Sequence, residues 1–191
     1  MIRGLSYGAN VRRLVLLIVS ALVCGFAVSC SEDSGGSACT ARNATYFNSF
    51  ESTGDTAGWL GYVRIPNVLP DPERGQRCLR VTGACVQPAG RFMLPPVTKE
   101  GNYGFSCWAK VSSLDEGTHP GGELELVMAN RREGPRRIGF KVSSEDWAFY
   151  WSSERLHCLE GDSLRLEVCI GDLISPGHMF LDCLKVYRAR P

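Results

Sequence analysis

The sequence predicts an all-β domain in which two antiparallel sheets pack as a sandwich, behind an N-terminal export signal and a short linker. Apolar and polar residues alternate with a period of two from Tyr46 onwards, as expected for strands with one buried face. The alternating runs are short and end at Gly, Pro, Asn or Asp, which is typical of strands joined by turns. A chain of 191 residues has the size of a single domain.

The first 29 residues have the pattern of a signal peptide. The segment contains no acidic residue, and an apolar run covers residues 14–28, which is short of the roughly 20 residues that a transmembrane helix needs. Its positive charge comes from Arg3, Arg12 and Arg13. A charged start, a short apolar run and small residues at the end favour a cleaved signal over a membrane span.

The signal ends in A-V-S-C at residues 27–30, which resembles the lipobox of bacterial lipoproteins. The resemblance implies that Cys30 is lipidated and becomes the first mature residue, and that Ser31 directs the protein to the outer membrane. The expected location is therefore the cell envelope, with a membrane anchor at Cys30. A plain signal peptide cleaved after Ser29 is the alternative, and an uncleaved apolar helix is a third.

Residues 30–45 are predicted to form a flexible tether, because S-E-D-S-G-G-S follows Cys30 and Gly/Ser-rich segments behave as flexible linkers. The folded domain is expected to span residues 46–188. A formal net charge of +1 argues against nucleic acid as a partner, because that function needs a marked basic excess.

Nine segments are predicted as strands. In one of them, Leu164, Leu166 and Val168 alternate with Arg165 and Glu167, so the first three should be buried and the last two should be exposed. The nine segments are 46–51, 77–82, 91–94, 103–111, 123–130, 136–142, 147–151, 163–170 and 179–187.

Three stretches carry a resemblance to a known family. F-N-S-F-E-S-T-G-D-T-A-G-W, Y-G-F-S-C-W-A-K and M-F-L-D-C-L-K-V resemble the opening, middle and closing strands of jelly-roll carbohydrate-binding modules, the galactose-binding-domain-like kind that binds xylan and glucan. The resemblance spans about residues 46–188. It implies a jelly roll that binds a polysaccharide and has no catalytic activity. The alternatives are a structural or protein-interaction lipoprotein without a sugar site and, third, a small glycoside hydrolase.

The resemblance also implies a structural calcium ion where the first and last strands meet. Glu51 and Asp182 match the positions of its ligands, although Cys183 stands where the family usually has a second aspartate. Calcium takes six to eight oxygen ligands, so other groups would have to join. The alternative is that Glu51 is an exposed strand-end acid and Asp182 caps a turn.

The cysteines indicate an oxidising compartment. The chain has nine, and seven remain after the signal and Cys30 are set aside, so three disulfides and one thiol are expected. In the family it resembles, the strand of Cys78 lies antiparallel to the strand of Cys169. One register would then pair these two cysteines and place Arg80 opposite Glu167, so we predict a Cys78–Cys169 disulfide.

The predicted binding face is built around Trp108. If Phe105 and its alternating neighbours on 103–111 are buried, Trp108 and Lys110 point outward. The same sheet is expected to present Arg80, Arg165, Glu167 and Glu125 beside them. An aromatic ring among hydrogen-bonding side chains suits sugar recognition.

Other aromatic and acidic residues receive a different interpretation. Trp147, Phe149 and Trp151 share one face of their strand and are expected to be buried. Glu123 and Glu125 share a strand face at a spacing that acid/base catalysis would permit. No hydrolase motif accompanies them, so no catalytic residue is predicted. Trp108 covering a sheet edge is the structural alternative to a binding role.

Overall fold

The computed structural model describes residues 39–66, 77–83, 87–114, 120–129, 134–171 and 176–190. The predicted signal peptide, the lipidation site Cys30 and residues 31–38 of the tether lie outside these ranges. In the part of the chain that is described, no helix has the length and apolar character needed to cross a membrane.

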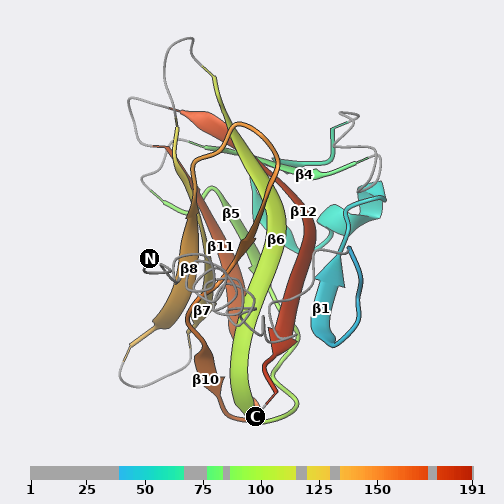
Figure 1. Cartoon of the computed structure of the whole chain (residues 1–191), viewed down its shortest axis with the longest axis vertical. Coiled ribbons are helices and arrows are strands. Elements are labelled where there is room, and N and C mark those ends of the chain that lie inside the picture. The colour runs from blue at the N-terminus through green and yellow to red at the C-terminus, as the bar shows by residue number, and fades with distance from the viewer. Residues whose placement is uncertain are drawn as a thin grey trace, which may run out of the picture. The chain divides into compact units, whose positions relative to one another are not determined.

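Two antiparallel sheets make up the domain (Figure 1), which confirms the predicted fold class. In sheet A the strand order is β10-β6-β12-β4-β3, with β1 also paired to β12 and β9 to β6; in sheet B the order is β2-β5-β11-β7-β8. Sheet A contains β1 (Ala44–Asn48), β3 (Val63–Arg64), β4 (Leu79–Gly83), β6 (Gly101–Ser113), β9 (Ala148–Trp151), β10 (Leu156–Cys158) and β12 (Gly177–Arg188). Sheet B contains β2 (Trp59–Gly61), β5 (Gly90–Met93), β7 (Gly122–Met128), β8 (Arg136–Val142) and β11 (Leu164–Ile170).

Each of the nine predicted strands corresponds to an observed one, with ends that shift by up to three residues. The prediction missed β2, β3 and β10, which have two or three residues each and are too short to display an alternating pattern. It also missed the 3-10 helix η1 (Thr53–Thr56), which Ser52 and Asp55 cap reciprocally. The first strand begins at Ala44 rather than Tyr46, so the folded part extends into the predicted tether.

The core lies between the two sheets and is built from the inward half of each alternating strand. Burial of these apolar side chains is the main force that holds the sheets together. Fully buried examples from five strands are Leu79, Phe105, Leu124, Leu166 and Leu181.

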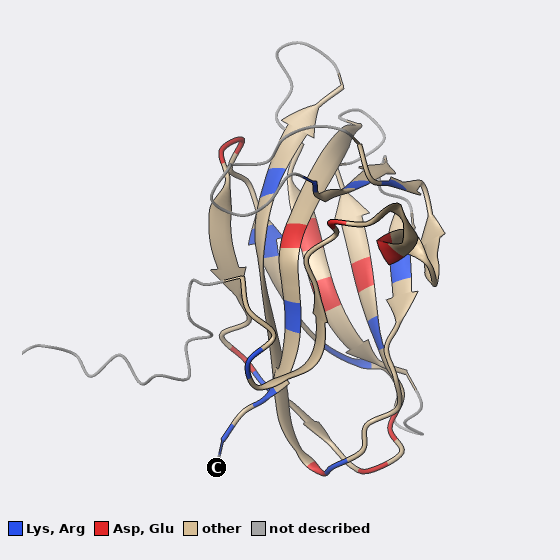
Figure 2. Ribbon diagram, turned by 90° about the vertical axis from the view of Figure 1, so that its right-hand side faces the viewer, with Lys and Arg blue, Asp and Glu red and all other residues tan. Residues whose placement is uncertain are grey.

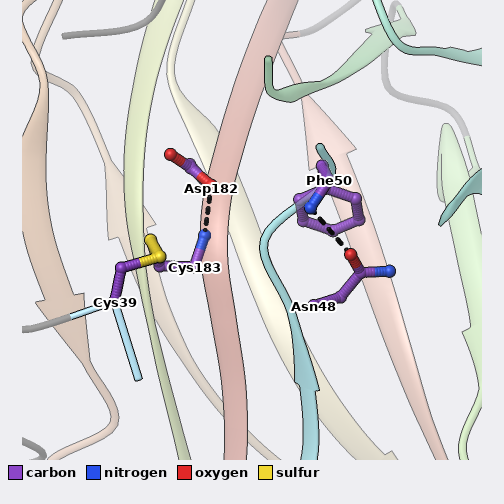
Figure 3. Close-up of a disulfide and its surroundings, with 5 residues drawn as sticks. All are labelled: Cys39, Asn48, Phe50, Asp182 and Cys183. Carbon is purple, nitrogen blue, oxygen red and sulfur yellow. Dashed lines mark hydrogen bonds between the residues drawn. A yellow bond between two sulfur atoms is a disulfide. The ribbon is translucent and has the colours of Figure 1, made fainter. Parts of the chain in front are cut away.

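A bulge in β12 changes the strand's neighbours. Before the bulge, between Asp182 and Lys185, β12 lies between β6 and β4; after it, β12 lies between β6 and β1. Cys183 occupies the bulge with a φ of 49° and forms a disulfide with Cys39, at a Cα–Cα distance of 5.1 Å. Figure 3 shows this bridge tying the segment before β1 to β12.

The predicted Cys78–Cys169 disulfide is wrong. Leu79, next to Cys78, pairs with Leu181 on β12 in sheet A, whereas Cys169 pairs with Glu123 on β7 in sheet B. Cys39–Cys183 is the one disulfide between described cysteines. Burial, followed by the charge of Asp182, raises the pKa of the Cys78 thiol to about 12.

Candidate functional site

The six residues of the predicted binding face divide between two surfaces. Arg80, Trp108 and Lys110 lie on sheet A, whereas Arg165, Glu167 and Glu125 lie on sheet B. The outer faces of a sandwich's two sheets point away from each other. The six side chains therefore do not form one site, and the prediction that they share a sheet is wrong.

The central part of the prediction is confirmed. β6 and β4 flank β12 in sheet A, with Trp108 paired to Asp182 and Arg80 paired to Phe180. Leu79 and Phe105 have exposed fractions of 0%, while Arg80 and Trp108 are half-buried. Neighbouring positions on a strand point to opposite faces, so Trp108 and Arg80 belong to the outer side of sheet A.

Two further aromatic side chains extend this outer side beyond Trp108. β9 pairs with β6 so that Phe149 lies opposite Trp108 and Trp151 lies opposite Ser106. The ring centroids are 5.5 Å apart for Trp108 and Phe149 and 6.1 Å apart for Phe149 and Trp151. Phe149 is half-buried and Trp151 is 50% exposed, so the expected burial of this strip is wrong. We call Trp108, Phe149 and Trp151 the aromatic face.

Charged and polar groups continue from the aromatic face along the same side of the sheet. The Lys110 ammonium lies 5.7 Å from the ring centroid of Trp147 and 5.4 Å from that of Phe180, which are cation–π distances. His178 Nδ1 lies 2.8 Å from Thr82 Oγ1. Burial, and then the charge of Arg80, lowers the pKa of His178, which favours its neutral form.

The outer side of sheet B carries a network of charges. Glu167 is 4% exposed; its Oε1 accepts a hydrogen bond from Arg165 Nε at 2.8 Å and lies 3.4 Å from Arg91 Nε. Arg137 donates to Glu125 Oε2 at 3.0 Å. Figure 2 shows that acidic and basic positions lie on the strands themselves as well as in the loops. We call these five residues the polar face.

The electrostatics of the polar face favour hydrogen bonding over catalysis by Glu125. Burial raises the pKa of Glu125, and the charges of Glu123 and Glu167 add to this effect, whereas Arg137 opposes it. Glu125 and Glu167 lie opposite each other on β7 and β11, and arginines contact both carboxylates. Such an arrangement orients donors and acceptors toward a ligand's hydroxyl groups.

The predicted calcium ligands lie near the junction of β1 and β12. Asp182 is fully buried, and its Oδ1 accepts a hydrogen bond from the Cys183 N–H at 2.6 Å, while Glu51 is exposed. Within the described ranges, Asp182 has ligand-type atoms within 4.8 Å on Cys39 and Cys183. Those sulfurs are joined in the disulfide and calcium prefers oxygen, so this group does not fit the ion. Calcium binding by Glu51 and Asp182 stays a prediction.

No family model matches the sequence, and no curated protein matches it. Solved structures do resemble the domain. A family 22 xylan-binding domain from Paenibacillus barcinonensis is 18% identical at a TM-score of 0.55 and covers 76% of this chain and 94% of its own. A family 22 carbohydrate-binding module from Clostridium thermocellum is 17% identical at a TM-score of 0.55, covering 78% of this chain and 97% of its own. The chain therefore has the jelly-roll fold of these carbohydrate-binding modules.

Proposed function

We propose that this protein binds a polysaccharide on the outer side of sheet A, through the aromatic face. The observation that carries the proposal is the continuous row of Trp108, Phe149 and Trp151, whose rings lie within 6.1 Å of one another in sequence along the row. The shared fold with xylan-binding modules supports it as an analogy, since fold alone does not determine function.

The chemistry of the aromatic face suits a sugar ring. An indole or phenyl plane packs against the apolar C–H side of a pyranose, and Trp151 offers an exposed ring for this contact. Lys110 and Arg80 lie on the same side of the sheet, where their N–H groups can donate hydrogen bonds to hydroxyls.

A second location for the same function is the polar face of sheet B. Its arginines and glutamates provide many donors and acceptors for hydroxyl groups, and Arg165 is held in place by Glu167. No aromatic side chain alternates outward among the described positions of its central strands β5, β7 and β11. Because sugar rings gain affinity by stacking, the aromatic face is the stronger site.

Affinity electrophoresis of the full chain on gels containing xylan, β-glucan or other polysaccharides tests this proposal. We expect at least one polysaccharide to retard the wild type, and Trp108→Ala or Trp151→Ala to weaken binding on the order of tenfold through loss of stacking. Tyr62→Ala is a matched control, because Tyr62 is 80% exposed and lies outside the aromatic face.

The variants also separate the competing interpretations. If Arg165→Ala abolishes retardation and both tryptophan variants keep it, the polar face is the site and the proposal for sheet A fails. If no polysaccharide retards the wild type and a stable protein partner co-purifies, the aromatic face is a protein interface, as clustered aromatic residues often are.

We also propose that a lipid on Cys30 holds the domain at the cell envelope, which would place it beside extracellular or periplasmic glycans. The support is the signal-like composition of residues 1–29 and the A-V-S-C sequence at their end. Metabolic labelling with a palmitate analogue in a bacterial host should label the wild type and Cys24→Ser but leave Cys30→Ser unlabelled. An unlabelled wild type would instead indicate a plain signal peptide.

A further inference from the structure

An apolar hollow with a basic rim lies at the end of the sandwich where β12 terminates. It is bounded by β1, residues 94–99 and the side chains of Tyr103, Leu164 and Val186, and its volume is about 360 Å³. A second hollow of about 370 Å³ adjoins it and shares Ala44, Thr45, Thr98, Lys99 and Tyr103 as lining residues. We call the two together the end hollow. Figure 1 shows the C-terminus and β10 at this end. The volume lies within the range of small-molecule sites.

The inner walls of the end hollow are apolar and belong to the core. Leu94, Val97, Leu164 and Val186 all have exposed fractions of 8% or less. Because these side chains pack between the sheets, the walls are held by the same contacts that stabilise the fold. Burial raises the pKa of both Tyr46 and Tyr103, so their phenol groups stay neutral and add no negative charge.

The segment that closes one side of the hollow is fixed by hydrogen bonds to both flanking regions. Leu94 N–H donates to Leu164 O at 3.0 Å, and Val97 N–H donates to Asp162 O at 3.0 Å. Tyr103 Oη donates to Lys99 O at 2.7 Å. The hollow is therefore formed before any ligand arrives, which reduces the ordering cost of binding.

The rim of the end hollow is positively charged. Lys99, Arg188 and Arg190 line its outer part, and no carboxylate is among the described residues that line it. Arg188 donates to Glu100 O at 3.1 Å. The nearby carboxylate of Glu100 lies 3.6 Å from His157 Nε2. The three cations are thus available to a negative group at the mouth of the hollow.

We propose that the end hollow binds an organic anion, with its apolar body against the inner walls and its carboxylate or phosphate at the rim formed by Lys99, Arg188 and Arg190. An apolar interior with a few charged groups at one end orients an amphiphilic ligand in a single direction. Charge-assisted hydrogen bonds from lysine and arginine are strong contacts for such an anion. The site is separate from the aromatic face and does not depend on carbohydrate binding.

Isothermal titration of the full chain with decanoate, in detergent-free buffer below its micelle concentration, tests the inference. We expect saturable binding that weakens with added salt. The double variant Lys99→Gln/Arg190→Gln should weaken it on the order of tenfold, the loss expected for charge-assisted hydrogen bonds. Thr98→Phe, at an exposed lining position, should block the hollow and abolish binding.

Controls give the other outcomes their meaning. Lys141→Gln makes a comparable change of charge at an exposed position on β8 and should leave decanoate binding unchanged; an equal loss there would indicate nonspecific attraction and overturn the proposal. Equal affinity for decanol would show that the rim plays no part. Binding of galacturonate without binding of decanoate would show that the ligand's body is a sugar ring, and absence of all binding would remove the site.

Discussion

Replacing Phe105 with alanine is expected to lower the free energy of unfolding by about 3–5 kcal/mol, the range for truncating a buried aromatic side chain. Phe105 is fully buried, and its ring stacks on Phe140 with centroids 4.8 Å apart. β6 lies beside the central strand β12 in sheet A, so the cavity would open in the middle of the core. Urea denaturation of the full chain, followed by circular dichroism, measures this loss.

Trp108→Ala is the matched comparison, because Trp108 lies three residues further along the same strand on the opposite face. We expect it to cost less than about 2 kcal/mol, since its half-buried ring leaves no closed cavity. If both variants lost equal stability, Trp108 would be part of the core and the aromatic face would lose its main residue. Phe105→Leu, which retains most of the apolar volume, keeps the comparison measurable should Phe105→Ala fail to fold.

Loss of the Cys39–Cys183 disulfide is expected to cost about 2–5 kcal/mol, because the bridge restricts the unfolded chain over a long loop. The two cysteines are separated by 144 residues, and the bridge holds the segment before β1 against the bulge of β12. Cys39→Ser removes the bridge at its more accessible end and leaves the backbone at Cys183, with its positive φ, unchanged.

A reductant separates the bridge from any effect of the serine itself. The free energy of unfolding of the wild type should fall in dithiothreitol toward the value for Cys39→Ser, while that of the variant should change little. A Cys39→Ser/Cys183→Ser double variant controls for exchange by the released thiol. If reduction left wild-type stability unchanged, the bridge would have no stabilising role.

Sequence alternation predicted the strands and their inward faces. The assignments of Phe105 inward and Trp108 outward followed from the period of two on β6, because each residue's side is set by its position in the pleated backbone. The outward row of Trp147, Phe149 and Trp151 was also visible in the sequence. It was assigned to the core because large aromatic residues are usually buried.

Other parts of the candidate sites have no local sequence pattern. Lys99 and Arg188 form one rim because β6 and β12 pair antiparallel, placing Tyr103 opposite Arg188. Cys39 and Cys183 meet because β1 pairs with β12 beside a bulge. Each of these arrangements depends on which distant segments become neighbours.

The sequence by itself determined that the chain is an all-β sandwich, which residues form its strands and which side of each strand is buried. Only the tertiary structure decided that Arg165 and Glu167 belong to sheet B while Arg80 and Trp108 belong to sheet A, and that Cys183 pairs with Cys39. Alternation is a property of a single strand, and several neighbouring strands can satisfy the same inward and outward pattern. Their choice depends on packing between segments far apart in the chain.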